Sequence, residues 1–195
     1  MKSKLRPITV SAILSAIGFV LMFFNFPIPI MPSFVKLDFS DFPALIGAFA
    51  LGPVYGAAIC LIKNILHFIL DNSGTGGVGE FSNFILSASF AVSAGLIYRL
   101  THNKRGAVIG ALFGALIMGF ISIYSNMFIV YPFYYNMLPK EAILGMYQAI
   151  LPGIESVEES LVVFNAPFTV VKGLICAVIT ILIYKPISPL LKGRR

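Results

Sequence analysis

Long apolar runs alternate with short polar segments along the whole chain. Runs of about 20 apolar residues are long enough to cross a bilayer as helices. We predict a first span over residues 8–24, a fourth over about 78–100, a fifth over about 106–130 and a sixth over about 165–186. The proline-rich stretch 27–32 predicts an extended loop after the first span, because proline does not continue a helix.

The apolar run over residues 42–70 decides the number of helices. Its length of roughly 29 residues is long for one typical span and short for two, and Gly52-Pro53 interrupts it. A single span would place the acidic loop 71–80 inside and the basic loop 99–105 outside, against the positive-inside rule. We therefore split the run at Gly52-Pro53 and predict an all-α membrane protein of six transmembrane helices.

Charge and composition agree with this reading. The 195 residues are 58% hydrophobic and 11% charged, with a mean hydropathy of +0.92, whereas soluble domains carry roughly 25% charged residues. The net charge of +6 indicates membrane topology and not a nucleic-acid partner, because the basic residues cluster between the apolar runs. With both termini cytoplasmic, the inner basic residues are Lys2, Lys4, Arg6, Arg99, Lys104, Arg105, Lys185, Lys192, Arg194 and Arg195. We expect one domain over residues 1–195.

A long connection, residues 131–163, is predicted outside the membrane between the fifth and sixth helices. Its 140–150 part has the length of a short helix. Long structured connections are often lids or binding loops, and a mobile exposed tether is the alternative.

Polar residues recur on one face of four predicted spans, always in the outer half. Ionisable side chains inside a span are costly and mark a functional site by default, so these stripes predict a pocket that opens outward. Internal pairing of Lys63 with Glu80, packing of His67 and snorkelling of Lys172 are the alternatives for single residues. The stripes are Lys63, Asn64, His67 and Asp71; Glu80, Asn83 and Ser87; Ser122 and Asn126; and Asn165, Thr169 and Lys172.

Small residues form further patterns in the inner halves. Such residues let helices approach closely. We expect the glycines to pack within the bundle, and the first-span face either to pack there or to dock another membrane protein. The sets are Ser11, Ala12, Ser15 and Ala16; Gly52 and Gly56; and Gly106, Gly110 and Gly114.

Several kinds of chemistry lack their motifs. The sequence has no phosphate-binding loop and no Gly-x-Ser-x-Gly nucleophile elbow. Cys60 and Cys176 lie in apolar runs without a spaced Cys/His set, so neither a disulfide framework nor a metal site is indicated. An intramembrane enzyme that uses His67 and Asp71 is the rival of another class, although these two side chains offer few metal ligands.

Four motifs occur in a specific order: FPIPIMPSFVKLDFSDFP at 26–43, Gly52-Pro53, KNILH at 63–67 and GEFSNF at 79–84. Together they resemble the substrate-binding (S) components of energy-coupling-factor vitamin transporters, and within them the riboflavin branch. The resemblance implies capture of riboflavin at the outer side of a prokaryotic cell membrane, with FMN left open. It also implies a transmembrane coupling subunit, docked on Ala12 and Ala16, and two cytoplasmic ATPases that use ATP. The chain needs no cofactor of its own in this reading.

The resemblance also implies roles for single residues. Asn136 and Lys172 match the positions that bind the pyrimidine-like edge of the flavin ring, and an amide and an ammonium suit that edge. Phe34, Val35 and Phe39 would pack on the ring, whereas an interfacial aromatic belt is preferred for Tyr131, Tyr134 and Tyr135. The ribityl hydroxyls would be bound by residues from Glu80, Asn83, Lys63 and Asn64, and Asp41 and Asn165 complete the candidate set. The rival within the family is another vitamin, such as folate, thiamine or pantothenate.

Overall fold

The computed structural model describes residues 5–32, 35–71 and 76–192, so Lys2, Lys4, Phe34, Arg194 and Arg195 lie outside the described residues. A short antiparallel pair, β1 (Phe26–Pro27) and β2 (Lys36–Leu37), lies within the predicted extended loop. Two π-helical segments, Asn126–Val130 and Leu161–Asn165, continue into α6 and α9. The helices are α1 (Leu5–Phe23), α2 (Phe42–Ala50), α3 (Pro53–Leu70), α4 (Val78–Thr101), α5 (Lys104–Ser125), α6 (Tyr131–Tyr134), α7 (Lys140–Gln148), α8 (Val157–Ser160) and α9 (Ala166–Lys192).

Five helical stretches in the described part of the chain are long and apolar enough to cross a membrane: Leu5–Phe23, Pro53–Leu70, Val78–Thr101, Lys104–Tyr134 and Val157–Tyr184. Large apolar side chains remain exposed along these helices, for example Ile109, Leu116 and Phe120 on α5, as expected where lipid is the solvent. The structure therefore agrees with an all-helical membrane fold. The second predicted span, from residue 42 to the break at Gly52-Pro53, corresponds to α2, whose nine residues extend only about 13.5 Å and cannot cross the ~30 Å hydrocarbon core alone.

The predicted break at Gly52-Pro53 is where α2 ends and α3 begins. Gly52 has a φ of 115°, a conformation that is costly for residues with a Cβ atom, and Pro53 suits the first turn of a helix. The chain therefore turns sharply, and α2 is enclosed by α1, α3, α4 and α9. Leu45 and Ile46 of α2 are fully buried.

Small residues bring α4 and α5 together. A Cβ atom on Gly110 would lie 2.7 Å from the Ala94 carbonyl oxygen, and one on Gly114 would lie 2.9 Å from that of Phe90. Packing within the bundle is thus confirmed for these glycines. Gly52 differs from them, because its Cβ position meets no atom within 4 Å and only its backbone conformation calls for glycine.

The small-residue face of α1 divides into two. Ser11 and Ser15 are buried against the bundle, whereas Ala12 and Ala16 are exposed on the outer side of the helix. The two alanines therefore form a smooth strip that the bundle leaves uncovered.

Residues 135–156 form a folded cap and not a tether. The predicted outer connection of 131–163 is shorter than expected, because α6 prolongs the fifth helix to Tyr134 and helical structure resumes at Val157. The predicted short helix is present as α7. Its Ile143 and Tyr147 pack in a separate buried cluster with Tyr131, Val157 and Leu161, which holds the cap against the bundle.

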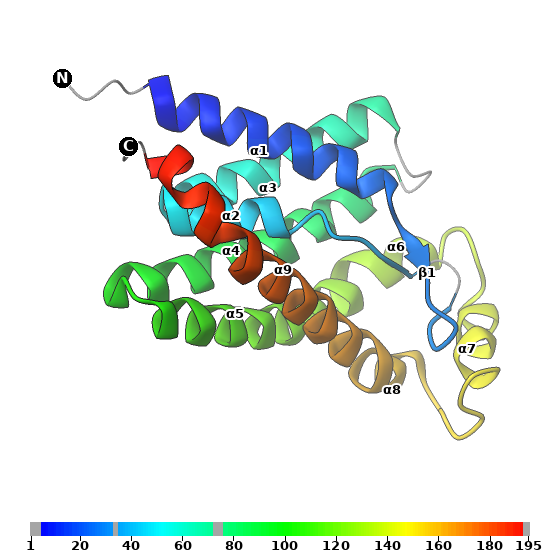
Figure 1. The fold of residues 1–195 in the computed structure, drawn as a ribbon. Coiled ribbons are helices and arrows are strands. Elements are labelled where there is room, and N and C mark those ends of the chain that lie inside the picture. The colour runs from blue at the N-terminus through cyan, green and yellow to red at the C-terminus, as the bar shows by residue number, and fades with distance from the viewer. Residues whose placement is uncertain (1–4, 33–34, 72–75, 193–195) are drawn as a thin grey trace.

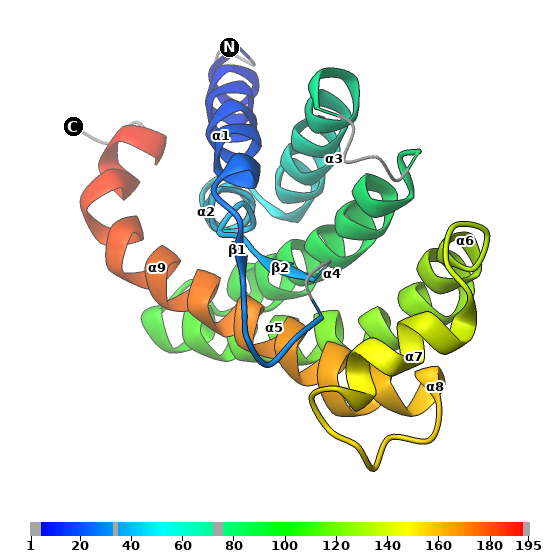
Figure 2. The same ribbon diagram turned by 90° about the vertical axis from the view of Figure 1, so that its right-hand side faces the viewer.

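The molecule has two different ends (Figure 1). The start of α1, the end of α9 and the turn between α4 and α5, which carries Arg99, Lys104 and Arg105, lie at one end. The β1–β2 loop and α7 lie at the other end, and Figure 2 looks onto that end.

Candidate functional site

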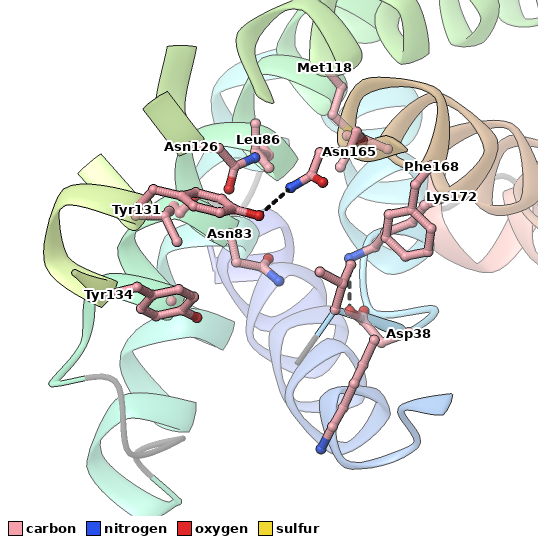
Figure 3. A pocket seen from close by; sticks show the side chains of 16 residues that line it. Asp38, Asn83, Leu86, Met118, Asn126, Tyr131, Tyr134, Asn165, Phe168 and Lys172 are labelled. Atoms are coloured by element: carbon pink, nitrogen blue, oxygen red, sulfur yellow. Dashed lines mark hydrogen bonds and ion pairs between the residues drawn. The ribbon is translucent and has the colours of Figure 1, made fainter. Parts of the chain in front are cut away.

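Residues from three of the four predicted polar stripes line one cavity together with Lys36 and Asp38 (Figure 3). They are Asn83, Asn126, Asn165, Thr169 and Lys172. The cavity has a volume of about 190 Å³ and adjoins a second cavity of about 430 Å³, with which it shares lining residues including Asp38 and Asn83. Together they fall within the range of roughly 300–1,000 Å³ that is usual for small-molecule sites. The polar residues of the first cavity are Lys36, Asp38, Ser82, Asn83, Asn126, Tyr131, Tyr134, Asn165, Thr169 and Lys172.

A network of four charged side chains joins the loop to α3 and α9. Lys172 Nζ lies 2.8 Å from Asp38 Oδ2 and 3.3 Å from Asp41 Oδ2, and Lys63 Nζ lies 2.5 Å from Asp41 Oδ1. Lys63 also donates to Ser40 Oγ at 2.7 Å. Two buried ammonium groups thus face two buried carboxylates, which satisfies the requirement that charges in an apolar interior be paired.

Burial and the two lysines act in opposite directions on the loop carboxylates. Burial tends to raise the pKa of Asp38, but the ammonium groups of Lys172 and Lys63 together outweigh this effect and lower the pKa below its ordinary value. The pKa of Asp41 is lowered in the same way, against burial, by Lys172 and Lys63. Both carboxylates are therefore ionised at neutral pH.

Ser87 connects this network to the cavity wall. Its Oγ lies 2.5 Å from Asp41 Oδ1 and 2.9 Å from Asn83 Oδ1. A hydroxyl has one hydrogen to donate, and the ionised carboxylate is the stronger acceptor. We therefore assign that hydrogen to Asp41, which leaves Asn83 to bind groups inside the cavity.

Tyrosines and an amide form the opposite wall. Tyr147 Oη donates to Asn165 Oδ1 at 2.7 Å, Asn165 Nδ2 donates to Tyr131 Oη at 3.2 Å, and the two tyrosine hydroxyls are hydrogen-bonded to each other. Burial raises the pKa of Tyr147, on the cap helix α7, to about 12. The cap thereby contributes to the cavity wall through neutral hydrogen-bonding groups.

The second cavity contains a histidine between two carboxylates. His67 Nδ1 lies 2.9 Å from Glu80 Oε1, and His67 Nε2 lies 3.3 Å from Asp71 Oδ2. Within the described residues no group of three or more His, Cys, Asp and Glu side chains is placed to hold a metal ion. The alternative of a Lys63–Glu80 pair does not apply, because Lys63 pairs with Asp41 and Glu80 with His67.

Six of the sequence-predicted residues line the cavities or support their wall. Lys172, Asn165 and Asn83 line the first cavity, and Glu80 lines the second. Lys63 and Asp41 are enclosed behind the wall, where they support it through their ion pair.

Three other candidates are not brought to the first cavity. Asn136 is exposed, and its amide donates to the backbone carbonyls of Pro132 and Phe133 at 3.2 Å. Asn64 lines a separate, mostly apolar groove between α3 and α4. Phe39 packs on Phe26 with ring centroids 6.0 Å apart, and its ring does not line either cavity.

Sequence reasoning missed Asp38 as a site residue and misplaced Tyr131. Two lysines predicted within spans require two buried acids, and the pair Asp38 and Asp41 in the adjacent loop was the signal for them. Tyr131 is buried in the cavity wall and is not part of an interfacial belt. Tyr134 also lines the cavity, whereas the Tyr135 ring lies 5.8 Å from Lys140 Nζ.

Comparison with known proteins places this architecture in a family. Residues 6–184 match the family model of the ECF transporter, substrate-specific component. The chain belongs to this family. It is therefore a transporter component and not an enzyme, and the rival reading of His67 and Asp71 as an intramembrane active site is set aside.

Full-length relatives of this S component are also known. The chain is 33% identical to the riboflavin transporter RibU of Staphylococcus aureus, over 98% of this chain and 95% of the relative. It is 31% identical to the riboflavin transporter FmnP of Bacillus subtilis, over 98% and 97%. The solved structure of the S component of a bacterial ECF transporter superposes with a TM-score of 0.76 at 31% identity, over 97% of this chain and 99% of that chain.

Proposed function

We propose that this S component is the riboflavin-binding subunit of an ATP-driven ECF uptake transporter. The observation that carries the proposal is that two relatives matched over nearly their whole length are named riboflavin transporters. The cavity chemistry supports it, because an amide-lined and lysine-lined chamber with tyrosine walls suits a flat ring that carries carbonyl and N–H groups.

The proposal includes an orientation in the membrane. The start of α1, the end of α9 and the basic α4–α5 turn lie at the end opposite the cavity (Figure 1). By the positive-inside rule, that end faces the cytoplasm, so both termini are inside and the cavity faces out. Residues 1–195 act as one transmembrane domain of a prokaryotic cell membrane, in which α2 is the one of the six bundle helices that does not cross the membrane.

The transported vitamin leaves the cavity only with partner proteins in this proposal. A transmembrane coupling subunit docks on the exposed strip of Ala12 and Ala16, where the absence of bulky side chains lets another helix approach closely. Two cytoplasmic ATPases supply the energy, in keeping with the lack of a phosphate-binding loop in this chain.

Among the cavity residues, Lys172 binds a ring carbonyl, and Asn165 and Asn83 bind other polar groups of the vitamin. Glu80 in the adjoining cavity binds ribityl hydroxyls. Lys63 and Asp41 act indirectly, by holding the loop and Lys172 in place.

Titration of the purified protein with riboflavin, followed by quenching of flavin fluorescence, tests the proposal. Lys172→Gln should weaken binding by about 1–3 kcal/mol if one buried polar contact is lost. Asn136→Ala, which removes an exposed amide bonded to its own helix, should change the affinity less than about twofold and serves as the matched control.

Competition separates this function from its rivals. Excess unlabelled folate, thiamine or pantothenate should not displace riboflavin, and FMN tested in the same way defines whether a phosphate is accepted. A purified protein that binds one of the other vitamins and does not quench riboflavin would refute the proposal.

A further inference from the structure

The carboxylate of Asp38 stands inside the cavity beside the ammonium of Lys172. Asp38 lines both adjoining cavities, and Lys172 lines the first. The two groups are 2.8 Å apart, and Figure 3 shows them meeting at one wall. Asp38 is the only carboxylate among the described residues that line the first cavity.

This carboxylate retains room for another hydrogen bond. Its Oδ1 accepts the backbone N–H of Ser40 at 2.8 Å and its Oδ2 accepts from Lys172. An ionised carboxylate offers about four lone-pair sites, so two acceptor sites remain. Because the side chain is partly accessible, 11% exposed, and lines the cavity, a bound molecule can reach them.

The segment that carries Asp38 is tied to its surroundings on both sides. β2 pairs with β1, and Lys36 lies opposite Pro27. Lys63 donates hydrogen bonds to the side chains of Ser40 and Asp41. A preorganised polar group loses little entropy when it binds its partner. The Asp38 carboxylate is therefore positioned as a fixed element of recognition.

The pair imposes a hydrogen-bonding pattern on its ligand. An ionised carboxylate only accepts, and an ammonium only donates. A ligand edge that matches them presents an N–H next to a carbonyl oxygen. The imide edge of the isoalloxazine ring has this arrangement, with one N–H between two carbonyls.

We propose that Asp38 is the specificity-determining residue that accepts the imide N–H of the flavin ring, while Lys172 donates to the neighbouring carbonyl. The assignment rests on the proposed function and adds a charged acceptor to the neutral amides that it already includes. An N–H···O⁻ bond of this kind is charge-assisted and is stronger than a bond between neutral groups. It selects ligands that keep the ring N–H.

The test compares riboflavin with 3-methylriboflavin, in which a methyl group replaces the imide hydrogen. Dissociation constants are measured by fluorescence quenching on the purified full chain. The natural protein should prefer riboflavin roughly ten- to a hundredfold, the range for one buried hydrogen bond to a charged group. In Asp38→Ala the preference should fall below about threefold, because the acceptor is gone and the methyl group has space.

Two further variants keep the result interpretable. Asp38→Asn preserves the shape and removes the charge, so it should show an intermediate preference even if Asp38→Ala does not fold. Glu141→Gln removes one negative charge from the exposed side of α7 and should leave the preference unchanged.

The possible failures are distinguishable. An unaltered preference in both Asp38 variants would overturn the inference, because the methyl group would then be excluded by something other than the carboxylate. Equal affinity of the natural protein for both flavins would overturn it as well. A protein that binds neither flavin refutes the proposed function itself.

Discussion

Replacing Asp41 with asparagine removes the carboxylate that two buried lysines share. Asp41 and Lys63 are both 0% exposed, with 2.5 Å between Oδ1 and Nζ, and Lys172 Nζ lies 3.3 Å from the other carboxylate oxygen. In Asp41→Asn, Lys172 keeps Asp38, but Lys63 keeps only neutral acceptors, the Ser40 hydroxyl and the new amide oxygen. An ammonium is left without a counter-charge in the apolar interior.

The size of the effect follows from that unpaired charge. Breaking a buried ion pair by removal of one partner costs about 3–5 kcal/mol. For a chain of this length each kcal/mol shifts the unfolding midpoint by about 2–4 °C, so Asp41→Asn should lower Tm by about 6–20 °C. Glu158→Gln is the matched control, because its pair with Lys140 is 47% exposed on both sides; such pairs contribute about 1 kcal/mol at most.

Thermal unfolding of the purified protein in detergent measures both changes. Adding Lys63→Met to Asp41→Asn removes the stranded ammonium and should recover part of the lost Tm. If Asp41→Asn shifted Tm no more than Glu158→Gln does, or if Lys63→Met brought no recovery, the reasoning from charge burial would be wrong.

Three other predictions concern other parts of the molecule. Ala12→Trp or Ala16→Trp should abolish uptake in cells that carry the partner subunits and leave riboflavin affinity unchanged, because these side chains face away from the bundle; loss of binding would show damage to the fold instead. Because the pKa of folded Asp38 lies below its ordinary 3.8, its ion pair is fully stabilising above about pH 5 and is lost as the pH falls through 3.8 toward the folded pKa. Tm should therefore drop from about pH 5 to pH 3, and less steeply in Asp38→Asn. Gly110→Val should lower Tm by several degrees, because its first added atom would lie 2.7 Å from the Ala94 carbonyl, whereas Gly145→Ala, which meets no atom within 4 Å, should not lower it; equal shifts would contradict the close-packing argument.

The prediction of the fold rested on the length of the apolar runs and on the periodicity of polar residues within them. The break at Gly52-Pro53 was predictable because the charge distribution excluded one long span, and the stripe of Asn165, Thr169 and Lys172 reached one cavity because helical spacing places them on one face. The length of α2 was not predictable in this way. An enclosed short helix is as apolar as a spanning one.

The periodicity of the sequence could not predict which polar side chains pair with one another inside the membrane. A pair of Lys63 with Glu80 was one alternative, but in the structure Lys63 pairs with Asp41 of the loop and Glu80 pairs with His67 of α3. These contacts depend on how the β1–β2 loop folds back over the bundle. Local sequence pattern does not specify such long-range placement.

The chain has two cysteines in all, and both lie in the core at 0% exposure. Neither thiol is accessible to water-soluble maleimides in the folded protein, so the natural sequence already serves as a background for single-cysteine labelling. A cysteine placed at Gly153, an exposed position in the cap where a Cβ meets no atom within 4 Å, would carry the reactive thiol. Fluorescent or spin labels there can report which side of the membrane the cap occupies without any further change to the protein.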